Sequence, residues 1–178
     1  MDKKAVLKLI KDEEVDYVDI RFTDPRGKLQ HVTVVADLVD EDFLDEGFMF
    51  DGSSIAGWKS IDQSDMKLMP DASSAYVDPF YAEKTICIHC NVVEPDTMEP
   101  YDRDPRGTAV KAEEYLKSSG VGDTAYFGPE AEFFVFDDVR FSVSMNKVSY
   151  QVDALDGAWN TDTEYEMGNT GHRPGIKG

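Results

Sequence analysis

The chain has 178 residues, enough for one medium-sized domain or two small ones with cores of their own. It carries 36 acidic against 18 basic residues, a net charge of −18, so its surface repels phosphate backbones and anionic lipids but favours cations. No apolar run approaches the ~20 residues that span a bilayer, and the lysine-interrupted start is a poor signal peptide. We therefore expect a cytoplasmic protein with no nucleic acid or membrane partner.

The first 46 residues predict a helix, a hairpin and a second helix. Apolar residues recur at helical spacing over residues 3–13, and alternation over 18–23 then predicts a half-buried strand. The sequence Asp24-Pro25-Arg26-Gly27 fits a type I turn, so a hairpin should lead into a second strand through Val32 and Val34. Residues 39–46 predict a short acidic helix.

The middle of the chain predicts a long irregular segment and one strand. Residues 48–84 lose periodicity and gather Gly, Ser, Asp and Pro, while their aromatic content argues against disorder. Residues 85–94 predict a strand that contains Cys87 and Cys90. Residues three apart on a strand point to opposite faces, so these thiols cannot chelate one metal together. We expect two reduced thiols, one of them buried and the other not.

A domain boundary is expected between Pro95 and Asp102. Asp104 can cap a helix whose first residue is Pro105 and whose stop is Gly120. Strands are expected over 124–127 and 131–141, and a further one over 146–153. We therefore divide the chain into a helix at 1–13, a first domain at 14–98 and an incomplete second domain at 104–178.

Two glutamates are the first candidate site. Glu130 and Glu132 lie two residues apart in FGPEAEFFVFD, and on a strand such residues share one face. That spacing suits two divalent cations that clamp a transferring phosphoryl group. A solvated surface pair is the ordinary interpretation, but Glu132 leads directly into apolar sequence, where a carboxylate needs a partner.

Asp51 is the second candidate, in the turn Asp51-Gly52-Ser53-Ser54. A purely structural turn or N-cap is the ordinary interpretation. The functional alternative is an acid that the turn holds rigidly. His31, His89 and His172 share no metal-ligand spacing, and no Walker-type glycine loop occurs.

Five segments together resemble the amino-terminal part of bacterial type I glutamine synthetase. They are FTDPRGKLQHVTV, FMFDGSSIAGWKSIDQSDMKLMPD, YDRDPRG, FGPEAEFFVFD and GNTGHRPGIKG. The resemblance implies an α+β fold, with a β-grasp domain followed by the truncated start of a catalytic domain. It also implies ATP-dependent ligation of ammonia to the side-chain carboxylate of glutamate, with Mg²⁺ or Mn²⁺, in a dodecamer of two hexameric rings.

The resemblance assigns roles to individual residues. Asp51 would bind and deprotonate ammonium beside Ser53, and Glu130 and Glu132 would each bind one metal ion. A nucleotide-proximal set is also implied: Trp58, Tyr126 and Gly128. The family's other site residues would lie beyond Gly178, so we expect this chain alone to be inactive.

Two alternatives stay open on the sequence. One is a sister ligase that couples glutamate to another amine. The other is a non-catalytic chain that docks onto complete subunits through its β-grasp face.

Overall fold

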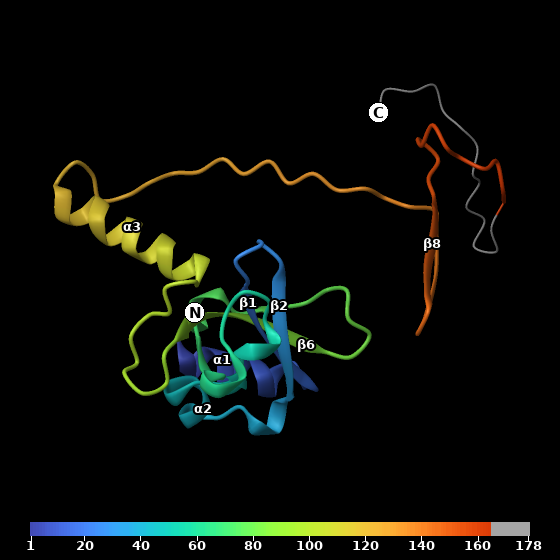
Figure 1. The fold of residues 1–178 in the computed structure, drawn as a ribbon. Coiled ribbons are helices and arrows are strands. Elements are labelled where there is room, and N and C mark those ends of the chain that lie inside the picture. Colours follow the sequence, from blue (N-terminus) through green and yellow to red (C-terminus); the bar gives the residue numbers. More distant parts are fainter. Residues whose placement is uncertain (165–178) are drawn as a thin grey trace. The chain divides into compact units, whose positions relative to one another are not determined.

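A computed structural model describes residues 1–164, which fall into two compact units divided between Tyr126 and Phe127. The first unit contains a six-stranded sheet with α1 (Lys3–Asp12), α2 (Glu41–Glu46) and α3 (Pro105–Ser119), and the second contains a β-hairpin (Figure 1). None of the helices among residues 1–164 is long and apolar enough to span a membrane. The cytoplasmic location stays a prediction. The predicted boundary between 98 and 104 stays a prediction.

The sheet has the order β2-β1-β6-β4-β3, and β5 also pairs with β6. Its strands are β1 (Tyr17–Thr23), β2 (Leu29–Val35), β3 (Phe48–Asp51), β4 (Asp65–Pro70), β5 (Tyr76–Val77) and β6 (Thr85–Val93). The β1–β6 pair is parallel, whereas β1–β2, β3–β4, β4–β6 and β5–β6 are antiparallel. This mixed sheet with helices confirms the predicted α+β class.

The hairpin prediction is confirmed. Strands β1 and β2 pair in register from Tyr17 with Val35 to Thr23 with Leu29. The buried Asp24 accepts hydrogen bonds from the backbone N–H groups of Arg26 and Lys28, both at 2.9 Å, and Gly27 has a φ of +83°. Glycine adopts this left-handed conformation without the steric penalty of a Cβ.

The prediction that residues 48–84 are irregular is wrong in part. The segment contains β3, β4 and β5, joined by 3-10 turns at Gly52–Ser54, Ile61–Gln63 and Ala72–Ser74. Each of these strands has six residues or fewer, so the local sequence carries little periodic signal for it.

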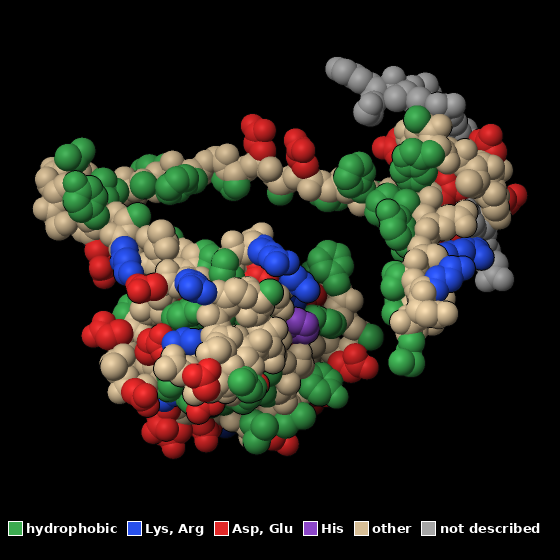
Figure 2. All heavy atoms as spheres, in the orientation of Figure 1, with side chains coloured by type: hydrophobic (Ala, Val, Ile, Leu, Met, Phe, Trp, Pro, Cys, Tyr) green, Lys and Arg blue, Asp and Glu red, His purple; other side chains and the backbone are tan. Residues whose placement is uncertain are grey.

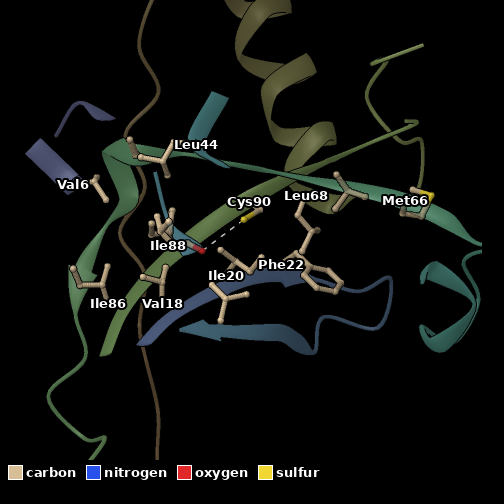
Figure 3. Packing of buried hydrophobic residues seen from close by; sticks show 14 of the residues in the cluster. Val6, Val18, Ile20, Phe22, Leu44, Met66, Leu68, Ile86, Ile88 and Cys90 are labelled. Carbon is tan, nitrogen blue, oxygen red and sulfur yellow. Dashed lines mark hydrogen bonds between the residues drawn. The ribbon is translucent and has the colours of Figure 1, made fainter. Parts of the chain in front are cut away.

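One face of the sheet forms the hydrophobic core with α1 and α2. Val18, Ile20 and Phe22 of β1 point into it, as do Ile86, Ile88 and Cys90 of β6 (Figure 3). Val6 from α1 and Leu44 from α2 cover this face and are buried. The alternation read from residues 18–23 therefore identified the core face of β1 correctly.

The opposite face of β1 carries a buried ion network. Asp19 is 1% exposed, and its carboxylate lies 2.7 Å from Arg21 Nε, Thr33 Oγ1 and His31 Nδ1. Arg21 also donates to Asp78 at 3.0 Å. Burial favours a higher pKa for the Asp19 carboxyl, but these donors outweigh it and the net pKa is lowered.

The expectation for the two cysteines is half right. Both thiols are free, and only Cys90 belongs to the core cluster, which agrees with side chains on opposite faces. The expectation that one thiol is exposed is wrong, since both residues are buried. Strand β6 is buried on both faces because Cys87 lies within the polar network, opposite Asp19 in the register and 3.5 Å from Asp78.

Asp104 both caps α3 and completes β6. The carboxylate is 1% exposed and accepts from Arg106 N at 3.0 Å and from the buried Val92 N at 2.9 Å. Pro105 occupies the first turn, and Gly120 ends the helix at a φ of +71°. The predicted helix signals are confirmed.

The second unit differs from prediction at its start. Strands β7 (Asp138–Ser144) and β8 (Lys147–Asp153) form the hairpin, which confirms the strand predicted over 146–153. Residues 124–136 have no regular secondary structure, so the strand over 124–127 is wrong and the strand over 131–141 begins only at Asp138. Phe133 and Phe134 are 81% and 84% exposed, and no partner strand pairs with them among the described residues.

The role of Asp104 predicts a specific loss of stability. Replacing it with Ala removes a helix cap and leaves the buried N–H of Val92 without an acceptor, which should cost about 2–4 kcal/mol. Chemical denaturation of the chain measures this loss. Asp102→Ala, at an exposed neighbouring position, is the matched control. Equal losses for both variants would contradict the role of Asp104.

The Asp19 network predicts weakening in acid. A carboxyl whose folded pKa is lowered stabilises the fold above its unfolded pKa of about 3.9, and this contribution disappears as pH falls through the folded value. Asp19→Asn should lower the melting temperature at pH 7 and flatten its decline below about pH 4. Asp37→Asn removes one charge from an exposed position and should leave that decline intact. An unchanged decline in Asp19→Asn would count against the network.

Candidate functional site

Asp51 ends β3 and caps the 3-10 turn at Gly52–Ser54. Its Oδ1 atom accepts from Ser53 N at 2.8 Å and from Ser53 Oγ at 2.6 Å. The residue is exposed, and no described residue donates to its Oδ2 atom. The turn thus holds a carboxylate rigidly through one oxygen and presents the other to solvent.

Gly52 lets this turn lie against β4. A Cβ at this position would lie 2.5 Å from Met66 Cγ, closer than real Cβ atoms approach, and a tight 3.1 Å from Ser64 O. The Gly52 N–H donates to Ser64 O at 2.6 Å. Only glycine permits this contact, so the turn is fastened to the sheet directly behind Asp51.

A second turn in the same unit has the same geometry. Asp71 accepts from Ser73 N at 3.0 Å and from Ser73 Oγ at 2.6 Å, within the sequence Asp71-Ala72-Ser73-Ser74. The two turns differ in whether the aspartate charge is paired, because Asp71 Oδ2 forms an ion pair with Arg106. The turn alone is therefore structural, and the unneutralised oxygen distinguishes Asp51 as a candidate site residue.

Trp58 lies inside the first unit rather than on its surface. It is 6% exposed, and its ring packs against Phe22, Phe50 and Tyr101 with centroids 5.3, 6.0 and 5.2 Å away. Its Nε1–H has no acceptor among the described residues. The ring is therefore held by packing, and little of it is free for a nucleotide in this structure.

The other predicted residues lie in the segment without secondary structure. Tyr126 is 93% exposed, and Gly128 has open space where a Cβ would be. Glu130 and Glu132 are exposed and have no regular secondary structure, so the expectation that they lie on a strand is wrong here. Side chains two residues apart share a face only where the backbone is pleated as in a strand. No neighbouring strand holds Glu130 and Glu132 in that conformation here.

The donor set for a metal ion is partial. Carboxylate oxygens are the ligands that Mg²⁺ prefers, so Glu130 and Glu132 have the right chemistry. Within residues 1–164, however, no three acidic, histidine or cysteine side chains lie close enough together to hold a metal ion. His172 and the GNTGHRPGIKG motif lie outside the described residues.

Sequence reasoning missed the residues that fasten the segment after Asp51. They are Arg103, Tyr101 and Glu94, which contact Gly57, Trp58 and Lys59. The motif YDRDPRG contained part of the signal, but local patterns indicated only its helix cap. A cavity of about 640 Å³ adjoins this segment, lined by residues that include Lys59, Asp65 and Glu94 but not Asp51.

Comparison with known proteins gives a consistent result. The family model for the glutamine synthetase β-grasp domain matches residues 14–95, and that for the catalytic domain matches residues 102–173. Glutamine synthetase from Cereibacter sphaeroides is 81% identical over 100% of this chain, and that from Rhodobacter capsulatus is 76% identical over 98%. The chain spans 38% and 40% of these two relatives.

A solved structure of Plasmodium falciparum glutamine synthetase has the same fold. It matches with a TM-score of 0.67 at 21% identity, over 93% of this chain and 33% of that one. The chain belongs to the glutamine synthetase family, from which it carries a β-grasp domain and the beginning of the catalytic domain.

Proposed function

We propose that this chain is the amino-terminal part of an ATP-dependent glutamate–ammonia ligase. The observation that carries the proposal is its 81% identity, along the whole chain, to a glutamine synthetase. The eight most similar curated relatives considered, at 54–81% identity, bear that name, which favours ammonia over another amine as the acceptor.

Asp51 supplies the acid–base chemistry in this proposal. A carboxylate of glutamate is a poor electrophile, so it is first converted to an acyl phosphate at the expense of ATP. The exposed oxygen of Asp51 attracts ammonium and accepts one of its protons, which frees the nitrogen lone pair to attack the acyl carbon. The C–N bond forms as the bond from that carbon to the phosphate oxygen breaks, and inorganic phosphate leaves. Ser53 positions the carboxylate through its backbone N–H and hydroxyl.

Glu130 and Glu132 hold Mg²⁺ or Mn²⁺ in the proposal, each binding one ion. Such ions supply neutralisation of phosphate charge during transfer. Two carboxylates are too few for tight binding, so the remaining ligands come from other parts of the complete protein. We further infer that Trp58, Tyr126 and Gly128 lie near the nucleotide. We also infer that the complete protein assembles as two hexameric rings.

The direct test is a chimera. This chain replaces the matching 38% of the Cereibacter sphaeroides enzyme, and glutamate- and ammonium-dependent phosphate release from ATP is measured. We expect an active ligase from the chimera and no activity from the 178-residue chain alone. A folded, assembled chimera without activity would contradict the proposal. Faster turnover with an alkylamine than with ammonium would favour the sister ligase.

Removing the charge of Asp51 should affect ammonia chemistry selectively. Asp51→Asn keeps an acceptor for Ser53 but cannot accept a proton, so turnover in the chimera should fall about 100-fold or more. The KM for ATP should change little. Asp71→Asn alters the twin turn and should reduce stability, not the response to ammonium. Equal losses in turnover and in ATP binding by Asp51→Asn would make its role structural.

The two glutamates should set the metal requirement. Glu130→Gln or Glu132→Gln in the chimera removes one charged oxygen ligand, so the Mg²⁺ concentration for half-maximal activity should rise by about tenfold. Titration of activity with Mg²⁺ measures this shift. Glu114→Gln, at an exposed position on α3, is the control. An unchanged requirement in both variants would remove these residues from the site.

A further inference from the structure

Three residues of the segment between β6 and α3 contact three consecutive residues after the Asp51 turn. Arg103 Nη1 donates to Gly57 O, and to Trp58 O at 3.3 Å. The Tyr101 ring packs against the Trp58 ring. Glu94 accepts from Lys59 Nζ at 2.6 and 2.9 Å. We call Glu94, Tyr101 and Arg103 the clamp.

The clamp is itself anchored to the central strand of the sheet. Tyr101 N donates to Val92 O at 2.9 Å, and Asp104 accepts from Val92 N at the same distance. Lys59 Nζ also lies 5.1 Å from the centroid of the Tyr101 ring, so Tyr101 contacts both Trp58 and Lys59. The clamp therefore transmits the position of β6 to residues 57–59.

The clamped residues connect to Asp51 through two consecutive turns. Ile55 N donates to Gly52 O at 3.1 Å, and Trp58 N donates to Ile55 O at 3.1 Å. Ile55 and Trp58 are buried, whereas Asp51, Ser54 and Ala56 are exposed. A displacement at Gly57 thus has only a short hydrogen-bonded path to the Asp51 carboxylate.

From these contacts we propose that Arg103 is a positioning residue for Asp51. Its guanidinium holds the two carbonyls that end the turn series, so the exposed carboxylate keeps one orientation. Arg103 touches neither substrate nor Asp51, and acts through residues 52–58. The proposal rests on the proposed function for its kinetic consequence, but the structural coupling stands apart from it.

The experiment compares Arg103→Met, Arg103→Lys and the unmodified chimera in two measurements. Hydrogen exchange should accelerate by about tenfold for amides in residues 52–60 of Arg103→Met, with α3 and β1 unchanged, because two hydrogen bonds are lost. The kcat/KM for ammonium should fall by about tenfold, while the KM values for ATP and glutamate stay within about twofold. Arg103→Lys keeps a charged donor and should recover part of both effects. Arg26→Met, at an exposed position, is the control.

The outcomes separate the two proposals. Unchanged exchange over residues 52–60 would overturn the clamp, whether or not the chimera is active. Faster exchange with equal kinetic losses for all three substrates would reduce Arg103 to a structural residue. An inactive unmodified chimera would defeat the ligase proposal, and exchange would still test the coupling. If Arg103→Met does not fold, Glu94→Gln takes its place, because it weakens the ion pair to Lys59. The same exchange and kinetic measurements are then made on that variant.

Discussion

Burial of β6 on both faces is the constraint on which the rest of the first unit depends. Its core face packs with α1 and α2, and its other face lies in the polar network around Asp19. Both edges of such a strand need hydrogen-bond partners, since buried backbone groups are costly to leave unpaired. Strand β1 pairs with residues Thr85–His89. Near the end of β6 (Figure 1), the backbone of Val92 is hydrogen-bonded to Tyr101 N and to the Asp104 carboxylate. The segment before α3 is thus needed to complete β6, and this places Arg103 beside the loop after Asp51.

Twin turns with unequal pairing show that local geometry does not by itself make a site. Asp51 and Asp71 cap the same kind of turn with nearly the same distances to a serine. Arg106 neutralises Asp71, while Asp51 presents an oxygen with no partner among the described residues. The acidic surface of the chain favours cations generally (Figure 2), but a rigid, exposed carboxylate binds one at a defined point. What distinguishes Asp51 from Asp71 is therefore a tertiary contact, the ion pair between Asp71 and Arg106.

The segment that carries Glu130 and Glu132 illustrates the opposite case. Its sequence has β propensity and large apolar side chains, yet its phenylalanines are exposed and its backbone forms no strand (Figure 2 shows green side chains along it). A strand is stabilised by cross-strand pairs and burial, not by propensity alone. The chain spans 38% of its Cereibacter sphaeroides relative. The metal-binding role of Glu130 and Glu132 is therefore proposed only for the complete protein.

The sequence by itself determined the features that depend on near neighbours. These are the helix ends at Asp104 and Gly120, the hairpin through Gly27, the core face of β1 and the family motifs. Capping, turn and alternation rules act over a few residues, so they can be read directly. Tertiary structure alone decided that β3, β4 and β5 exist, that both cysteines are buried, and that Asp71 is paired while Asp51 is not. It also brought Arg103 to Gly57, 46 positions away. Such contacts depend on which distant segments meet, and no local pattern encodes that choice.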